Sequence, residues 1–152
     1  MNISKFTQKS VQAVQDLEKV AYEYGNQEIE EEHLLYALLT QEDSLILKLI
    51  EKMEIQKEYF IDTVKKALDA KVKVSGGELR FGQYLNKALV SAEDEAKAMG
   101  DEYVSVEHLF LSMLKNPSPS MKKIFNEFGI TRERFLQALS TVCLLYTSDA
   151  AD

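Results

Sequence analysis

Hydrophobic residues recur with a helical period along most of the chain. In the first predicted helix, apolar or small residues stand three or four positions apart, at 6, 10, 13, 14, 17, 21 and 24. This spacing is typical of a helix with one buried face, and no stretch shows the period of two that a half-buried strand needs. The pattern therefore predicts an all-α fold.

The same pattern occurs twice in the sequence. Residues 81–139 repeat residues 6–64 at a constant offset of 75, and 14 of the 59 aligned positions are identical. The Glu-His-Leu triplet at 32–34 recurs at 107–109, and Gly25 recurs as Gly100. A repeat of this length indicates one supersecondary unit that was duplicated and fused. We therefore expect two like units that pack as one pseudo-twofold domain, with a seam between them where a partner can bind.

Each unit is predicted to contain four helices. Unit one covers 1–70, a connector covers 71–77, and unit two covers 78–142; the connector is polar and ends in glycine, so it is expected to be flexible. Thr7, Ser105 and Thr131 stand where helix N-caps are expected. Gly25 and Gly100 are expected to end the first helices in the left-handed conformation. The third helices are expected near 44–53 and 119–128.

The last ten residues, 143–152, match nothing in the repeat. The fourth helix of unit two is expected to finish near Val142, so we interpret the segment after it as a non-native tail. The alternative is that the segment is native and begins a linker to a further part of the protein. The single cysteine, Cys143, lies in this segment, so no disulfide is expected in the fold.

Composition excludes several classes of function. The 152 residues suit one domain or two very small ones, and 45% hydrophobic with 28% charged residues is typical of a soluble globule. The net charge of −7 argues against nucleic acid and against an anionic membrane, because both need clustered Lys and Arg. The sequence contains no apolar run long enough to span a membrane and opens without a signal-peptide core. A cytoplasmic setting is therefore expected.

Candidate chemistry centres on the two Glu-His pairs. Glu30 and His33 have the Glu-x-x-His spacing of di-iron carboxylate bundles, but Ser105 replaces the glutamate in unit two, so no metal site is expected. An acid–base role is disfavoured because adjacent helical residues point about 100° apart. The stronger interpretation is structural: Glu32 and Glu107 complement the helix dipole while the histidines hold the helix start. The alternative is that these glutamates contact a ligand at the seam.

No phosphate-binding loop and no nucleophile with recognisable partners occur in the sequence, so neither enzymatic activity nor a cofactor is expected for this chain. Val11, Val20 and Tyr22 lie off the main apolar stripe of the first helix. If they cluster at the seam, they form a patch for extended or unfolded chain. Scattered surface apolar residues are the more ordinary alternative.

The doubled Glu-His-Leu motif, the Phe-Thr-Gln opening at 6–8 and the Gly-Glu-Leu-Arg-Phe-Gly-Gln segment at 77–83 resemble the Clp amino-terminal domain over residues 1–142. Its ClpB-type disaggregase branch is the most similar. The resemblance implies a monomeric recognition domain on a homohexameric ring, whose own modules hold ATP. It implies unfolded or aggregated polypeptide, or adaptor proteins, as partners. It implies Thr7 and Glu107 as substrate-binding residues in an apolar groove, and we expect Val11 to contribute to it.

An alternative within the family is a ClpC- or ClpA-type unfoldase that feeds a protease and binds adaptors or phosphoarginine. The resemblance then implies a role for the glutamates of both Glu-His pairs, which are Glu32 and Glu107 here. The threonine that commonly precedes Glu-His in those relatives is Glu31 in unit one and Val106 in unit two. Glu31 adds negative charge where a phosphate would lie, which argues against phosphoarginine.

Overall fold

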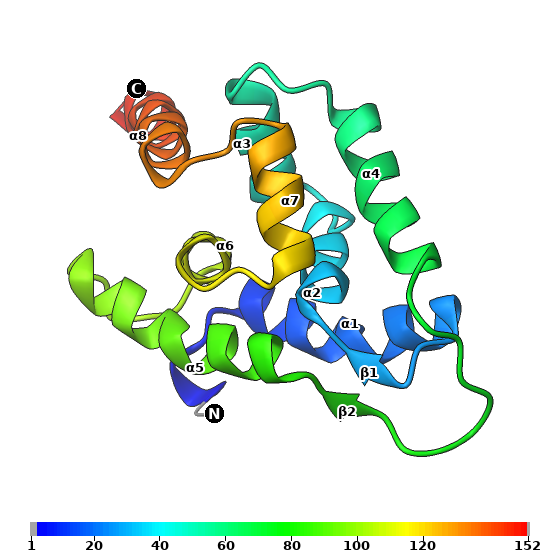
Figure 1. Ribbon diagram of the computed structural model, residues 1–152. Helices are drawn as coiled ribbons and strands as arrows, with labels where there is room; N and C mark the ends of the chain where they lie inside the picture. The colour runs from blue at the N-terminus through cyan, green and yellow to red at the C-terminus, as the bar shows by residue number, and fades with distance from the viewer. Residues whose placement is uncertain (1–2, 152) are drawn as a thin grey trace.

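The computed structural model describes the backbone of residues 3–151 and the side chains of residues 3–143. Its elements are, in chain order, η1 (Ile3–Lys5), α1 (Gln8–Tyr24), β1 (Glu28–Ile29), α2 (Glu31–Leu39), α3 (Leu45–Lys52), α4 (Lys57–Asp69), β2 (Arg80–Phe81), α5 (Gln83–Ala98), α6 (Val106–Lys115), α7 (Pro119–Glu127) and α8 (Arg132–Ala151). Figure 1 shows an assembly of helices with one very short pair of strands at its edge. The all-α prediction is confirmed.

The helices α1–α4 form unit one and α5–α8 form unit two. The repeat offset of 75 fails at one place, the start of the third helices. Ser44 is the N-cap of α3 and Ser118 is the N-cap of α7, so these residues correspond at an offset of 74. The gap-free alignment places Pro119 opposite Ser44, but proline lacks the side-chain acceptor of a cap and suits the first helical position instead.

The helix ends form as the sequence predicts. The Thr7 Oγ1 atom accepts a hydrogen bond from the Ser10 N–H at 3.3 Å and so caps α1. Gly25 has φ 68° and Gly100 has φ 74°, the left-handed conformation that ends α1 and α5 without a Cβ penalty. Thr131 Oγ1 accepts from the Arg134 N–H at 3.1 Å at the start of α8.

Short strand pairings join the two units reciprocally. β1 runs parallel to β2, with Ile29 opposite Phe81, and Phe6 forms an isolated parallel bridge with Val104. Phe6 corresponds to Phe81 in the repeat, and Ile29 corresponds to Val104. The start of each unit's first helix is therefore paired with the entrance to the other unit's second helix. The sequence did not predict these strands, because two residues carry no alternating pattern.

One hydrophobic core extends through both units. α2 contacts α5 and α6, α3 contacts α6 and α8, and α4 contacts α7. The rings of Phe60 and Phe128, one from each unit, meet edge to face with centroids 5.0 Å apart. Arg134 Nη2 donates to the Met53 carbonyl at 2.5 Å and so closes the end of α3 from unit two. The predicted packing of two four-helix units as one domain is confirmed.

Two segments differ from their predictions. The connector was expected to be flexible, but the Val74 N–H donates to the Gly25 carbonyl at 2.9 Å and Asn26 Nδ2 donates to the Val72 carbonyl at 3.1 Å. These bonds hold the first half of the connector against unit one. α8 also continues to Ala151, past Val142, where its end was expected. That residues 143–152 are a non-native tail stays a prediction, and the side chains of residues 144–152 lie outside the described part.

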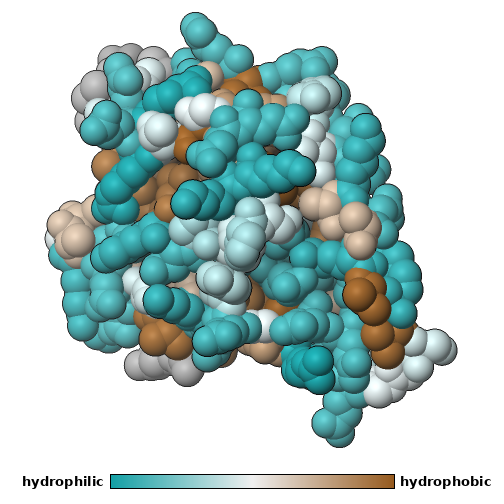
Figure 2. Space-filling view, in the orientation of Figure 1, coloured by the Kyte–Doolittle hydropathy of each residue, from teal (hydrophilic) through white to brown (hydrophobic). Residues whose placement is uncertain are grey.

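The face shown in Figure 2 is mostly hydrophilic, and its hydrophobic areas are small and separated. Of the three residues expected off the apolar stripe of α1, Tyr22 is 72% exposed, Val11 is partly buried against the core and Val20 is only 5% exposed. The expectation for Val20 is therefore wrong. α1 contacts β1 and α6 in addition to α2, and this broadens its buried face.

Candidate functional site

A hollow of about 320 Å³ lies on the seam between the two units. Unit one contributes residues from the start of α1 and from the segment between α2 and α3, and unit two contributes the start of α6. We call it the open seam site, and its lining residues are Thr7, Lys9, Gln41, Asp43, Leu45, Ser105, Val106 and Glu107.

Backbone pairing across the seam fixes Thr7 beside α6. Its N–H donates to the Val104 carbonyl at 3.0 Å, one residue before the N-cap Ser105. The Thr7 hydroxyl lies 3.1 Å from Ser10 Oγ and caps α1, so its position is set by the helix start. The result is a half-buried hydroxyl that faces the entrance of a helix from the other unit.

His108 holds the unit-two side of the hollow. Its Nδ1 atom accepts from the Ser105 N–H at 2.8 Å, so this nitrogen carries no proton and Nε2–H donates to Asp101 Oδ2 at 2.8 Å. These two bonds fix the first turn of α6. Glu107, at the second position of that turn, is half-buried, and its carboxylate complements the positive end of the helix dipole.

Polar residues form the rim of the open seam site, and hydrogen bonds and an ion pair within unit one hold them in place. Lys9 Nζ donates to the Glu42 carbonyl at 2.6 Å, and Gln41 Nε2 donates to the Lys9 carbonyl at 2.8 Å. Asp43 Oδ1 lies 2.7 Å from Lys48 Nζ, and this hydrogen bond and charge lower the pKa of Asp43. The rim therefore presents charges of both signs, while Leu45 and Val106 supply apolar surface within the hollow.

The opposite half of the seam is closed. Its residues follow from the repeat: Gly82 corresponds to Thr7, Glu31 to Val106, and Ser118 to the N-cap Ser44. We call these three residues the closed seam site. The Ser118 N–H donates to Glu31 Oε1 at 2.7 Å, and Glu31 is 0% exposed. Burial raises the pKa of Glu31 to about 7, although the bond from Ser118 lowers it and the neighbouring Glu32 adds to the rise.

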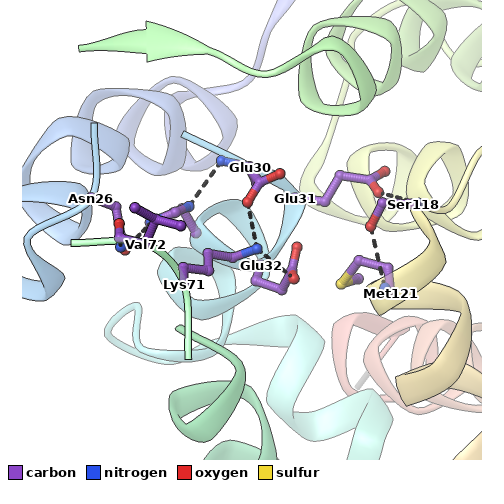
Figure 3. A network of polar contacts seen from close by, with 9 residues as sticks. Asn26, Glu30, Glu31, Glu32, Lys71, Val72, Ser118 and Met121 are labelled. Carbon is purple, nitrogen blue, oxygen red and sulfur yellow. Dashed lines mark hydrogen bonds and ion pairs between the residues drawn. The ribbon is translucent and has the colours of Figure 1, made fainter. Parts of the chain in front are cut away.

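Glu32 is held by the connector next to the closed seam site. Lys71 Nζ lies 2.9 Å from Glu32 Oε2 and 2.5 Å from Glu30 Oε2. Burial alone lowers the pKa of Lys71, but its close contacts with the carboxylates of Glu30 and Glu32 outweigh this and raise it. Figure 3 shows Glu30 and Glu32 converging on Lys71, while Glu31 is directed toward Ser118 on α7.

His33 is fully occupied as a structural residue. Its Nδ1 atom accepts from the Glu30 N–H at 2.9 Å, and its Nε2–H donates to Asn26 Oδ1 at 2.9 Å. Burial lowers the pKa of His33 to about 4, and the positive charge of Lys71 lowers it further. Both ring nitrogens are bonded within the protein, so the Glu-x-x-His spacing does not present a metal ligand here.

The structure brings together two of the four predicted site residues. Thr7 and Glu107, one from each unit, line the same hollow. Glu32 is 1% exposed and paired with Lys71, and Val11 packs against the core without lining the open seam site. The sequence analysis did not predict that six further residues line the open seam site: Lys9, Gln41, Asp43, Leu45, Ser105 and Val106. One of them, Val106, could have been noticed in the repeat alignment, because an apolar residue there corresponds to the charged Glu31 in unit one.

Within residues 3–151, no helix is long and apolar enough to cross a membrane. Among the same described residues, no cluster of three or more His, Cys, Asp or Glu side chains is placed to hold a metal ion.

The fold and the seam define a tandem helical-repeat domain whose two units share one core. A family described as "Clp repeat (R) N-terminal domain" matches residues 5–141. The chain belongs to this family, as its Glu-His-Leu repeat indicated. The matching family is an N-terminal domain and not a catalytic ATPase module.

Two relatives are ClpB chaperones. The chaperone protein ClpB of Nitratidesulfovibrio vulgaris is 38% identical over 148 residues, which are 93% of this chain and 17% of the relative. The chaperone protein ClpB of Clostridium tetani is 38% identical over 147 residues, with the same shares. The chain therefore spans about a sixth of the length of the curated relatives that it matches, at 17%.

Solved structures have the same fold. The Hsp104 N-terminal domain from Candida albicans matches with a TM-score of 0.76 and 21% identity, over 88% of each chain. The ClpV N-domain solved as a complex with a VipB peptide matches with a TM-score of 0.68 and 21% identity, over 91% of this chain and 89% of that one.

Proposed function

We propose that this chain is the amino-terminal substrate-recognition domain of a ClpB-type disaggregase chaperone, and that it binds unfolded or aggregated polypeptide at the open seam site. The observation that carries the proposal is the joint placement of Thr7 and Glu107. They come from different units, yet both line one hollow of about 320 Å³, and the Thr7 N–H donates to the Val104 carbonyl across the seam.

The relatives support this proposal. The chain is 38% identical to two ClpB chaperones. A domain of the same fold, the ClpV N-domain, was solved with a peptide bound. A peptide-binding role for this chain is consistent with both findings.

The open seam site suits a short segment of an extended chain. Leu45 and Val106 can pack against an apolar side chain of the client. The Glu107 carboxylate can accept from a backbone N–H or a cationic side chain. The Thr7 hydroxyl donates to Ser10 Oγ and can accept one further hydrogen bond. Affinity should be weak, because a small hollow must order a disordered client at considerable entropic cost.

In this proposal, an ATP-driven ring drives the movement of the client, and the display of several copies of this chain on the ring provides avidity. The chain is displayed in several copies on a homohexameric ATP-driven ring in the cytoplasm, so one client can contact several weak sites at once. Neither ATP nor a metal takes part in the recognition step itself, which depends on the side chains of the seam.

Phosphoarginine binding, as in a ClpC-type receptor, is the alternative that the test must separate. On the unit-one side, the Ser118 N–H already donates to the buried Glu31 carboxyl group, so this donor is not free for a phosphate. This contact argues against a phosphoarginine site in that half of the seam.

The test is an amide NMR titration of the full chain with reduced, carboxymethylated α-lactalbumin, a permanently unfolded polypeptide. Shifts should cluster at Thr7, Leu45, Val106 and Glu107, and they should weaken in Thr7→Ala and Glu107→Gln variants. A parallel titration with free phosphoarginine should leave these residues unmoved. Saturating phosphoarginine shifts without any polypeptide shifts would replace the proposed function with the receptor.

A further inference from the structure

The two halves of the seam have the same architecture but differ at one decisive position. In both halves, the second helix of one unit begins close to the N-cap serine of the other unit's third helix. The first helical residue is Glu31 in α2 and Val106 in α6, and the facing N-caps are Ser118 and Ser44. The backbone arrangement is therefore the same in both halves, but the side chain beside the start of the third helix is Glu31 in one half and Val106 in the other.

Glu31 behaves as a ligand bound within the closed seam site. Its Oε1 atom accepts from the Ser118 N–H at 2.7 Å, and it is 0% exposed. The start of α7 is the positive end of the helix and favours the ionised form of Glu31, although burial has the larger effect and raises its pKa. None of the described residues donates a hydrogen bond to the other carboxylate oxygen, Oε2, although it is buried. A buried acid with one oxygen unpartnered is costly for the fold, so its role is not explained by packing alone.

Val106 cannot make the same contact in the open seam site. It is 6% exposed and lines the hollow, but its side chain has no acceptor for the start of α3. The Ser44 side chain still caps its own helix, because Ser44 Oγ accepts from the Leu47 N–H at 3.1 Å. The carboxylate present in one half of the seam is therefore missing from the other half, where the hollow remains.

We propose that Glu31 is an internal ligand that closes the second seam site, so that each domain offers polypeptide one site instead of two. The part of this inference that concerns polypeptide rests on the proposed function. The closed seam site is then a carboxylate-binding position that the chain itself fills, and the identity of residue 31 decides how many sites the domain has.

The first arm of the test uses sodium formate as the smallest carboxylate probe, with sodium chloride at equal ionic strength as its control. In a Glu31→Val variant, which copies the residue of unit two, formate should shift the Ser118 amide with saturation. In the wild-type chain, the same amide should shift at least about fivefold less. If a folded Glu31→Val protein shows no formate shift at Ser118, the inference is overturned.

The second arm uses the unfolded α-lactalbumin probe. Glu31→Val should gain a second group of shifts at Gly82 and Ser118, whereas Glu31→Gln should not, because its amide oxygen can still accept from Ser118. The reverse change, Val106→Glu, should weaken binding at the open seam site about tenfold or more. The double variant Glu31→Val/Val106→Glu should move the shifts from one half of the seam to the other.

The outcomes separate the two proposals. Polypeptide shifts that stay at the open seam site in Glu31→Val, with no second group, overturn the closure as a limit on binding. If the polypeptide shifts no amide signals in either half of the seam in any variant, the proposed function is wrong. The formate titration still decides whether Glu31 occupies a carboxylate-binding position. If Glu31→Val does not fold, the Val106→Glu variant alone decides: unchanged polypeptide binding overturns the inference.

Discussion

The open and the closed seam sites lie at equivalent positions of the repeat but carry different side chains. Thr7 pairs with Val104 on one side, and Gly82 pairs with Ile29 on the other, through equivalent backbone bonds of 3.0 and 2.7 Å. On the open side, Glu107 is half-buried and Thr7 lines a hollow. On the closed side, Glu31 and Glu32 are buried; Glu31 accepts a hydrogen bond from the Ser118 N–H, and Glu32 forms an ion pair with Lys71.

The two halves share their backbone architecture, and they differ in the ion pair and the hydrogen bond that hold the glutamates of unit one. Lys71 of the connector neutralises Glu32, and Ser118 receives Glu31. Lys71 lies in the connector after unit one, and among residues 3–143 no lysine forms an ion pair with Glu107. The same motif therefore gives a structural residue in one copy and an accessible one in the other.

The largest expected effect comes from removing the cation of the closed side. Lys71→Met leaves the buried Glu32 carboxylate without its partner, and breaking a buried ion pair in this way costs about 3–5 kcal/mol. Urea unfolding at pH 7 measures the loss. The double variant Lys71→Met/Glu32→Gln should recover most of it, since neither charge then remains. Equal losses in the single and double variants would show that the charge pairing is unimportant.

The next effect is a pH dependence that separates Glu31 from the rest of the seam. The pKa of Glu31 is about 7 in the folded state against 4.5 for an ordinary glutamate, so its contribution to stability is fully present below pH 4.5 and is lost as the pH rises through 7. Glu31→Gln has no such loss. The free energy of unfolding of Glu31→Gln relative to wild type should therefore increase by about 3 kcal/mol between pH 4.5 and 8.

His33 provides the opposite slope in the same experiment. Its pKa is about 4 in the folded state against 6.5 for an ordinary histidine, so its contribution is present above pH 6.5 and is lost as the pH falls through 4. In the wild type the two slopes oppose each other between pH 4.5 and 6.5. Stability in Glu31→Gln should rise more steeply with pH in this window than in the wild type. Parallel curves would contradict the assignment of Glu31, and a Glu31→Gln curve that does not rise would contradict that of His33.

On the open side, the expected effects are on binding more than on stability. Thr7→Ala should cost about 1 kcal/mol of stability through loss of the α1 cap. Thr7→Ala and Glu107→Gln should each weaken unfolded polypeptide about fivefold, or about 1 kcal/mol. Fluorescence anisotropy with labelled α-lactalbumin measures this. Glu32→Gln is the matched control on the closed side, and an equal loss of affinity there would contradict the comparison.

The smallest expected effect tests whether the two histidine anchors are equivalent. Asp101→Asn gives His108 the same kind of partner that His33 has in Asn26. Neutral His108 can donate from Nε2 to an amide oxygen as well as to a carboxylate oxygen, and Asp101 is half exposed. The free energy of unfolding at pH 8 should change by less than about 0.5 kcal/mol. A larger loss by urea unfolding would show that the carboxylate charge is needed.

Much of the fold could be predicted because its signals are local. The helical period, the caps at Thr7 and Ser105, and the left-handed glycines at 25 and 100 depend on a few neighbouring residues, and all of them formed as expected. The break in the repeat at Ser44 and Ser118 was not predicted, although Pro119 carried the signal. The strand pairing of Ile29 with Phe81 left no pattern to detect, because it extends over only two residues.

The candidate site was predictable only in part. Thr7 and Glu107 were named from a resemblance, and the structure places them at one hollow. Glu32 and Glu107 begin the same Glu-His-Leu triplet, and the triplet alone does not separate them. Their difference depends on Lys71, which lies 39 residues further along the chain, and on how the connector packs.

The sequence by itself determined that the chain forms a duplicated helical domain with matching helix starts, because periodicity, capping and glycine conformation act over short distances. Which half of the seam is open depends on contacts between residues that are distant in the sequence. Burial and ion pairing depend on residues that meet across the fold, such as Glu31 with Ser118, 87 positions apart. Electrostatic interactions of this kind are set by distance and solvent exposure, and neither is written in the local order of residues.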